Sequence, residues 1–221
     1  RSKSSILEII IDPQAPAPEF PGDIALIEQT ARAIKQARAH DRPVIMAYGA
    51  HLIKNGLGAV VAALVDRGHI SHLATNGAGS IHDWEFAFQG ASEEDVRGYV
   101  GAGRFGLWQE TGSYINLAIL LGAAAAEGYG RSVAKLVHNE ELEIPDSEQL
   151  RRQIITGLQN RQPGLTARLN LYEKIVSAGL DPGRQKIPHP FKRYSVQNAA
   201  FAAGIPLTIH PGFGYDIIYG N

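Results

Sequence analysis

The chain of 221 residues has no cysteine, and this absence removes several kinds of chemistry at once. A disulfide framework, a thiolate nucleophile and a cysteine-ligated zinc or iron–sulfur site are all excluded. A long hydrophobic run is also missing, because the longest apolar segment, 117–126, is interrupted by Gly122. It falls short of the roughly 20 residues that a membrane-spanning helix needs. We therefore expect a soluble protein, with the cytoplasm as its default compartment.

Neither sign of charge is in excess. The 21 basic and 22 acidic residues leave a net charge of −1, so no general attraction to nucleic acid or to an anionic membrane is expected. Hydrophobic residues make up 44% of the chain, which is enough apolar material for one sizeable core. The length favours a single domain, so we predict one α/β domain over residues 1–221.

The N-terminal segment reads as a strand followed by an arm. Residues 6–11 form an apolar run that predicts a strand, and Asp12-Pro13 then begins a proline-rich stretch through Pro21. Proline cannot continue a strand ladder, so residues 1–22 are expected to form an N-terminal strand and a proline-rich arm.

The following segments predict a parallel crossover unit. A buried strand over 44–48, a helix over 57–65 and a second strand over 70–75 come in that order, and a later strand over 205–210 leads into the loop 211–216. Ligands of such sheets lie beyond the carboxyl ends of the strands. The chain then stops where an open α/β sheet ordinarily continues, so we expect the domain to be incomplete at its C-terminus.

The rest of the chain is mostly helical in pattern. Asp23 is expected to cap the first helix, and the acidic run 138–143 is interpreted as a solvated linker. The helices could cover the sheet or pack on another subunit. The predicted helices span residues 24–37, 81–89, 93–100, 113–126, 147–158, 165–178 and 194–203.

Glycine follows each strand of the crossover unit. Gly49 comes after the first strand and Gly77 after the second. Glycine allows a close backbone approach, and the following helix presents free N–H groups and a partial positive charge to an anion such as a pyrophosphate. A single turn of this kind also occurs in many α/β proteins without a nucleotide, so the pair matters more than either member. The pair predicts a dinucleotide site.

The order and spacing of these motifs resemble the deoxyhypusine synthase family, particularly its archaeal-type members. The motifs are Gly49-Ala50 with Gly56-Leu57, then Thr75, Gly77-Ala78 and His82-Asp83. The resemblance implies a Rossmann-like three-layer α/β fold with a mostly parallel sheet, bound NAD and a homotetramer. It also implies a transferase reaction in which NAD takes hydride from spermidine and an aminobutyl group passes to a lysine of an acceptor protein.

The resemblance assigns roles to residues at the matching positions. His82 and Asp83 match polar residues near the polyamine and are the candidate catalytic pair, while Glu85 and Asp216 are candidate substrate contacts. A carboxylate there could pair with an ammonium, and a neutral imidazole could accept a proton. The candidate NAD contacts are Gly49, Ala50, Thr75, Gly77 and Ala78.

Other interpretations stay open at this point. No lysine of the chain stands in the context of the family's catalytic lysine, which favours a non-catalytic nucleotide- or metabolite-binding module, or NAD-dependent amine oxidation without aminobutyl transfer. Asp83 could instead stabilise the first turn of its own helix. Aromatic residues such as Phe105 could line a pocket but more often belong to a core. No metal site is expected, and His51, His189 and His210 receive no role.

Overall fold

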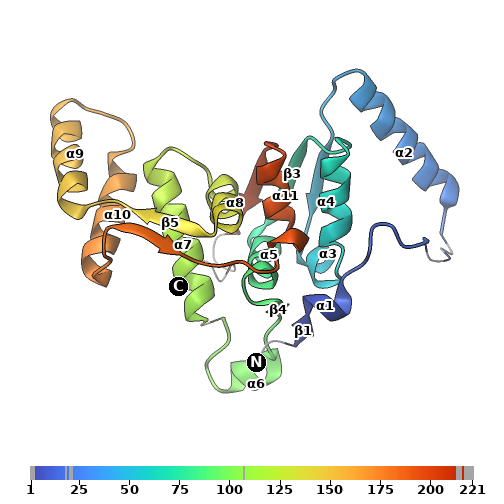
Figure 1. The fold of residues 1–221 in the computed structure, drawn as a ribbon, viewed down its shortest axis with the longest axis horizontal. Coiled ribbons are helices and arrows are strands. Elements are labelled where there is room, and N and C mark those ends of the chain that lie inside the picture. Colours follow the sequence, from blue (N-terminus) through green and yellow to red (C-terminus); the bar gives the residue numbers. More distant parts are fainter. Residues whose placement is uncertain (1–2, 18, 20–21, 107, 213–215, 217–221) are drawn as a thin grey trace.

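The computed structural model describes residues 3–17, 19, 22–106, 108–212 and 216 (Figure 1). The described part is an α/β structure that contains one small parallel sheet of three strands in the order β2-β3-β7. Its strands are β2 (Ile45–Tyr48), β3 (His72–Asn76) and β7 (Leu207–His210). The prediction of parallel strands in these three segments is confirmed, with boundaries shifted by one or two residues at most sites.

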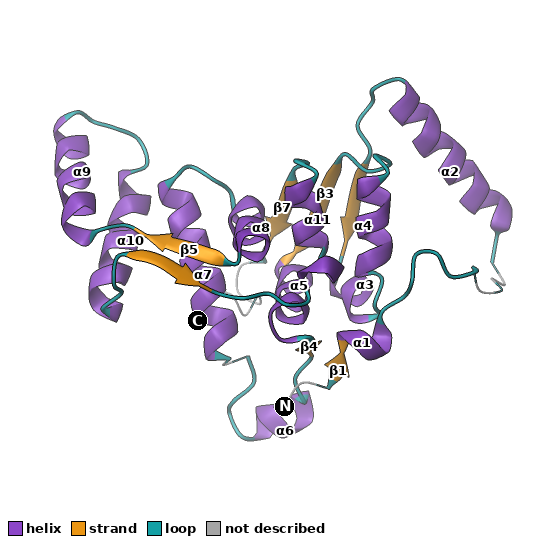
Figure 2. Ribbon diagram, in the orientation of Figure 1, coloured by secondary structure: helices purple, strands orange, loops and turns teal. Residues whose placement is uncertain are grey.

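Helices connect and cover these strands (Figure 2). The turn after β2 opens α3 (Ala50–Lys54), which is followed by α4 (Gly58–Asp66), and the turn after β3 opens α5 (Gly77–Gln89). A short 3₁₀ turn (Lys192–Tyr194) and α11 (Val196–Ala202) precede β7. Leu73, in the central strand, is fully buried, as expected for a strand with neighbours on both sides.

A second region is built on a two-stranded antiparallel sheet of β5 (Glu141–Ile144) and β6 (Gly183–Lys186). Its own apolar core includes Ile115, Val133 and Ile144 and is separate from the core under the parallel sheet. Helices α5 and α8 contribute residues to both cores and so join the two regions. The helices that build this region are α7 (Gln109–Ala124), α8 (Tyr129–Asn139), α9 (Ser147–Gln159) and α10 (Leu165–Ala178).

The predicted strand over residues 6–11 is wrong. Residues Ile6–Ile9 form a short helix, α1, while the strand β1 (Ser4–Ser5) pairs with β4 (Ala91–Ser92). Ile6, Ile9 and Ile10 are spaced i, i+3 and i+4, and all three pack on the core under the parallel sheet. This is the spacing of one helical face, and it decides the conformation over the β propensity of isoleucine.

The interpretation of 138–143 as a solvated linker is also wrong. The segment contains the end of α8 and most of β5, where Leu142 and Ile144 are buried and Glu143 is exposed. That alternation is the period of a strand with one covered face. Glu140 adopts a left-handed conformation (φ 58°) at the end of α8 and binds Lys192 through an ion pair of 2.8 Å.

Two helices lie at the margins of the structure. Helix α2 (Ile24–Ala39) begins at Asp23, whose side chain accepts a hydrogen bond from the Leu26 N–H as predicted for an N-cap. Its N-terminal part stands away from the parallel sheet (Figure 1), whereas Arg38 Nε near its C-terminus donates to the carbonyl oxygen of Gly68 at 2.9 Å. Helix α6 (Val96–Gly101) lies beyond β4. None of the described helices is both long and apolar enough to cross a membrane.

Candidate functional site

Both glycine turns lie at the end of the parallel sheet where the carboxyl ends of its strands meet. Tyr48 at the end of β2 pairs in register with Thr75, and Asn76 at the end of β3 pairs with His210 at the end of β7. The three following loops therefore start side by side, at the carboxyl ends of the strands, where open α/β sheets bind ligands. A Cβ atom built on Gly49 would lie 3.7 Å from Asn76 Nδ2, so the two turns are neighbours.

The two turns differ in what surrounds them. A Cβ atom on Gly49 would meet only that ordinary contact, whereas a Cβ atom on Gly77 would lie 2.0 Å from a carboxylate oxygen of Asp216. The N-terminus of α5 is therefore covered by a carboxylate of the same chain, in the place where an anionic ligand was expected. Asp216, a predicted substrate contact, lies beside Gly77.

A cavity of about 310 Å³ opens beside the Gly77 turn. One wall is a face of α5 that carries Ala78, Ile81, His82 and Glu85 at helical spacing. The opposite wall comes from Glu94, Phe105 and Gly106, and Asn76 and Asp216 complete the lining. The volume is at the lower end of the roughly 300–1,000 Å³ typical of ligand pockets, which suits a small molecule.

A hydrogen-bonded chain joins the two polar residues of α5 that face this cavity. His82 Nδ1 lies 2.6 Å from Ser92 Oγ, and Ser92 Oγ donates to Glu85 Oε2. Since the Ser92 proton is used on Glu85, Nδ1 must carry the hydrogen that it shares with Ser92. The lone pair of His82 then lies on Nε2.

Burial sets the charge state of this chain of residues. Burial, assisted by the electrostatic effect of Lys54 and His51, lowers the pKa of His82 to about 4, so the ring is neutral at pH 7. Burial also raises the pKa of Glu85, against the hydrogen bonds that its carboxylate accepts from Ser92 and from Thr111 Oγ1 at 3.0 Å. The charge of the nearby Glu94 adds to that rise. A cation in the cavity would stabilise the charged form of Glu85 against both its burial and the repulsion by Glu94.

Asp83 does not face this cavity, contrary to the role predicted for it. It is 2% exposed and binds the N-terminus of α11, where its carboxylate accepts hydrogen bonds from Ser195 Oγ (2.6 Å), Val196 N–H (2.9 Å) and Gln197 N–H (3.1 Å). It does not support the first turn of its own helix either, because α5 begins at Gly77. Asp83 is thus a structural link between α5 and α11.

The remaining predicted NAD contacts lie at the carboxyl ends of the strands but do not line the cavity. Thr75 is buried and its hydroxyl donates to the carbonyl oxygen of Tyr48 at 2.9 Å, which ties β3 to β2. Ala50 begins α3 directly after Gly49. Of the predicted NAD contacts, therefore, only Ala78 lines the cavity, and Gly77 lies directly before it in the chain.

Several residues of the site carry no signal in the sequence. Ser92 and Thr111 are separated from Glu85 by 7 and 26 positions and belong to no motif. Phe105 does line the cavity, which was one of the two interpretations open for it. Trp84 and Phe88, by contrast, stack on each other in the core at 4.7 Å between ring centroids.

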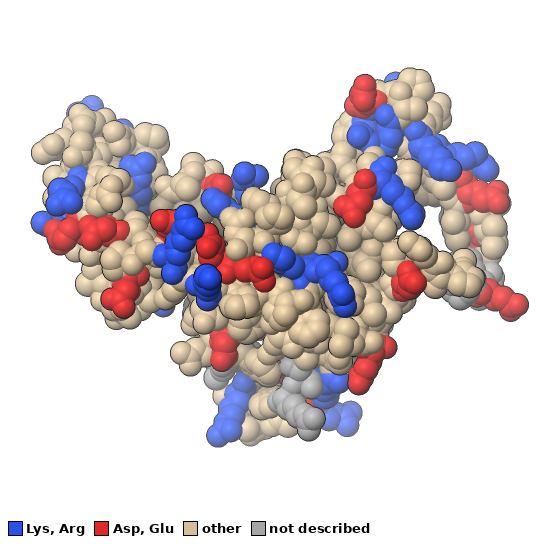
Figure 3. All heavy atoms as spheres, in the orientation of Figure 1, with Lys and Arg blue, Asp and Glu red and all other residues tan. Residues whose placement is uncertain are grey.

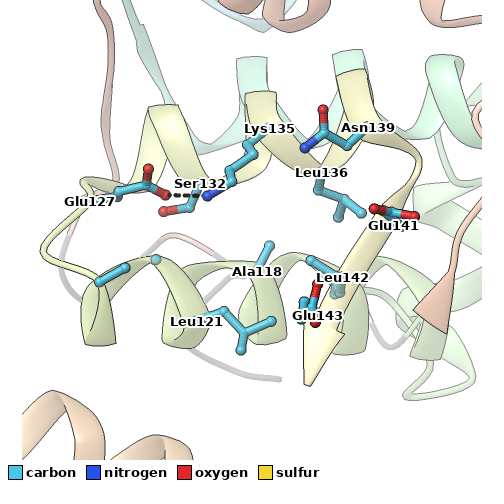
Figure 4. A pocket seen from close by; sticks show the side chains of 12 residues that line it. Ala118, Leu121, Glu127, Ser132, Lys135, Leu136, Asn139, Glu141, Leu142 and Glu143 are labelled. Atoms are coloured by element: carbon cyan, nitrogen blue, oxygen red, sulfur yellow. Dashed lines mark hydrogen bonds and ion pairs between the residues drawn. The ribbon is translucent and has the colours of Figure 1, made fainter. Parts of the chain in front are cut away.

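A second cavity of about 320 Å³ lies between α7, α8 and β5 (Figure 4). Its wall is apolar at Leu121 and Leu136, and an ion pair of 3.3 Å between Lys135 and Glu127 crosses one end of it. None of the sequence-predicted site residues lines it. Within the described residues, no three histidine or acidic side chains gather as a metal site would require.

The surface charge is mixed. Acidic and basic side chains are interspersed over the face drawn in Figure 3, in keeping with the net charge of −1. The comparisons with known proteins add no assignment. Neither a protein-family model nor a curated protein was found that matches this chain.

Proposed function

We propose that this chain binds a small organic amine, of the polyamine class, in the cavity beside Gly77, and that it oxidises the amine with NAD bound at the neighbouring turns. The observation that carries the proposal is the charge of the lining. Glu85, Glu94 and Asp216 reach the cavity from three different segments, and no Lys or Arg is among the described residues that line it. Three carboxylates around an apolar floor suit an alkyl ammonium ion.

His82 gives the cavity a group that can move a proton. Oxidation of an amine requires that the ammonium nitrogen first lose a proton, so that its lone pair can form the C=N bond as hydride leaves the adjacent carbon. Nε2 of the neutral His82 can accept this proton only against the burial that lowers the pKa of the ring to about 4, and Nδ1–H, held by Ser92, becomes the second N–H of the imidazolium. Glu85, bound to the same Ser92, stabilises the charge that the ring acquires.

The residues fit NAD at one turn and not at the other. The Gly49 turn leaves room for a close approach, and NAD bound there would supply the hydride acceptor. At Gly77 the carboxylate of Asp216 opposes a pyrophosphate by like charge. The parallel sheet with ligand-side turns is compatible with the Rossmann-like three-layer fold that the resemblance to deoxyhypusine synthases implies. The tetramer and the acceptor protein stay predictions of that resemblance.

Calorimetry on the 221-residue chain tests the amine site. Spermidine and putrescine should bind with measurable heat, while 1,4-butanediol, which has the carbon chain of putrescine without its charges, should not. NAD is titrated separately, with Gly49→Ala as the variant that fills the space at the first turn. Equal binding of the diamine and the diol would refute an ammonium site, and unchanged NAD binding by Gly49→Ala would remove NAD from that turn.

A second candidate is an amine-binding module that uses no nucleotide. The position of Asp216 against the N-terminus of α5 favours it, because the chain's own carboxylate occupies the anion position. Formation of NADH separates the two candidates. Spermidine-dependent NADH absorbance without an acceptor protein supports the NAD-dependent amine dehydrogenase. Amine binding without NAD binding supports the amine-binding module.

A further inference from the structure

Three consecutive residues at and after the end of β4 have different partners. Ser92 Oγ lies 2.6 Å from His82 Nδ1 and donates to Glu85. Glu94 lines the cavity beside α5. Glu93, between them, is not part of that lining. The backbone at Glu93 therefore decides where two polar groups of the candidate site lie.

The backbone of Glu93 is in the left-handed region, at φ 69°. A residue with a Cβ atom adopts this region at a cost in energy, and it stays there only where its surroundings hold it. Uncommon backbone angles of this kind gather at functional sites. The contacts that hold Glu93 thus also fix the directions of Ser92 and Glu94.

Two side chains from distant parts of the chain hold the Glu93 carboxylate. Lys54 Nζ, at the end of α3, lies 2.6 Å from Glu93 Oε1, and Ser4 Oγ donates to Glu93 Oε2 at 2.6 Å. The side chains of Lys54 and Glu93 are only 30% and 23% exposed, so water screens this ion pair less than a fully exposed one. Both oxygens of the carboxylate are therefore bound.

Backbone hydrogen bonds tie the same segment to the N-terminal strand. Ser4 pairs in register with Ser92, and the Lys3 N–H donates to the carbonyl oxygen of Glu93 at 2.8 Å. Strands β1 and β4 lie together below α3 and α5 in the view of Figure 1. Glu93 is thus held by β1 and by α3, the helix that begins after Gly49.

We propose that Lys54 and Glu93 form a positioning pair for the amine site, which acts through Ser92 on the tautomer of His82. The part of the pair in amine binding rests on the proposed function, whereas the tautomer is a property of the chain without ligand. While the ion pair holds Glu93, Ser92 Oγ stays at Nδ1 and keeps the hydrogen of the neutral ring there. Without the pair, the left-handed backbone relaxes and the Ser92 hydroxyl leaves the ring.

Nitrogen-15 NMR of the chain without ligand tests the pair. Glu93→Ala should shift the neutral His82 ring from mainly Nδ1–H towards the Nε2–H form, as Ser92→Ala should do. The double variant should show no further change, because both substitutions act through one hydroxyl. Resonances of His189, whose ring packs on Trp84 in the core of the second region, should not move and so check the fold. An unchanged His82 tautomer in Glu93→Ala overturns the proposal, as does a further change in the double variant.

A charge exchange separates the ion pair from either residue alone. Lys54→Glu places two carboxylates together and should change the tautomer as Glu93→Ala does, and Lys54→Glu combined with Glu93→Lys should restore the Nδ1–H form. Lys3→Met is the matched control, since it removes an ion pair of 3.1 Å with Asp95 in the same region, between side chains that are 53% and 51% exposed. It should leave the tautomer unchanged. No recovery in the exchanged variant, or an equal change in Lys3→Met, overturns the role of the pair.

Calorimetry with putrescine connects the pair to the ligand. Glu93→Ala should weaken binding about two- to fivefold, as for the loss of one neutral hydrogen bond. Undiminished affinity in Glu93→Ala, when the unaltered chain binds putrescine, overturns the part of the pair in amine binding. If the unaltered chain binds no putrescine, the proposed function is refuted, and the NMR result then decides on the pair by itself.

Discussion

Helix α5 buries one carboxylate on each of two sides, and the two sides use that group differently. Toward α11, Asp83 is 2% exposed and accepts hydrogen bonds from one hydroxyl and two backbone N–H groups. Toward the cavity, Glu85 is 9% exposed and accepts from the hydroxyls of Ser92 and Thr111. Burial raises the pKa of both carboxyl groups, so neither burial nor the direction of the pKa shift separates them.

The kind of donor separates them. The backbone N–H groups at the start of α11 are fixed by the helix and have no other partner to turn to, so Asp83 is committed to the fold. The hydroxyls that bind Glu85 can rotate, and Ser92 also contacts His82. Glu85 can therefore exchange partners when a cation enters the cavity, whereas Asp83 cannot. A structural carboxylate and a ligand-binding one are thus distinguished by the freedom of their donors.

The largest effect is expected on stability, when the hydrogen bonds between Asp83 and the start of α11 are removed. Asp83→Ala leaves Ser195, Val196 and Gln197 with buried donors and no acceptor, and it should lower the free energy of unfolding by at least about 3 kcal/mol. Urea denaturation measures this loss. Asp83→Asn keeps one acceptor oxygen and should cost less. If Asp83→Ala loses no more stability than Glu85→Gln, the assignment of the two sides is reversed.

The sequence predicted where the parallel strands and their glycine turns lie, but not which residues of α5 face the cavity and which face α11. The parallel strands and the glycine turns follow from local patterns, and these were predicted in place. The start of α5 was placed at residue 81, whereas the helix begins at Gly77, where the Asn76 side chain accepts from the Gly79 N–H. Glycines are poor helix formers, and the cap outweighs them.

Helical spacing decides which side chains share a face, and the four additional residues add Ala78 to that face. With the helix running from Gly77, positions 78, 81, 82 and 85 form one stripe, and these are the α5 residues that line the cavity. Asp83 then falls on another face. Ser92 and Thr111 could not be predicted at all, because their contacts with Glu85 depend on the tertiary packing of β4 and α7.

Histidines sharpen the comparison through pH. Burial lowers the pKa of both His82 and His189 to about 4, although His82 lines the cavity and His189 packs edge-on against Trp84 in the core. At each of these two rings the folded chain then binds fewer protons than the unfolded chain between pH 4 and 6.5. The stability that each neutral ring contributes is present above pH 6.5 and is lost as the pH falls towards 4, at up to about 1.4 kcal/mol per pH unit for each ring.

Ring titration by NMR measures each histidine separately, which matters because the raised pKa values of the two buried carboxyl groups act on stability in the opposite sense. Both rings should stay neutral at pH 5.5. Putrescine should shift the resonances of His82 and leave those of His189 unchanged. A midpoint near 6.5 for either ring contradicts its burial, and a shift confined to His189 contradicts the position of the amine.

Glu85→Gln breaks the cavity side. Removing the charge should weaken putrescine binding about 10- to 100-fold, because a hydrogen bond to a charged group contributes about 1.5–3 kcal/mol. Titration calorimetry gives the affinity. Glu127→Gln is the matched control, since Glu127 is a carboxylate that lines the other cavity and should not affect the amine. Unchanged affinity in Glu85→Gln would show that the amine does not depend on this carboxylate.

The smallest effect is expected at Ser92, which links His82 to Glu85 without reaching the ligand itself. Ser92→Ala removes the acceptor that holds the hydrogen on Nδ1, so ¹⁵N NMR should show the neutral His82 ring change from mainly Nδ1–H towards the Nε2–H form. Amine affinity should fall only about two- to fivefold, as for one neutral hydrogen bond. Thr111→Val deletes the other hydroxyl on Glu85 without touching His82, and it should leave the tautomer unchanged. A tautomer that is the same in both variants would mean that His82 is positioned by something other than Ser92, and the pocket side of α5 would then lack the adjustable link that sets it apart from Asp83.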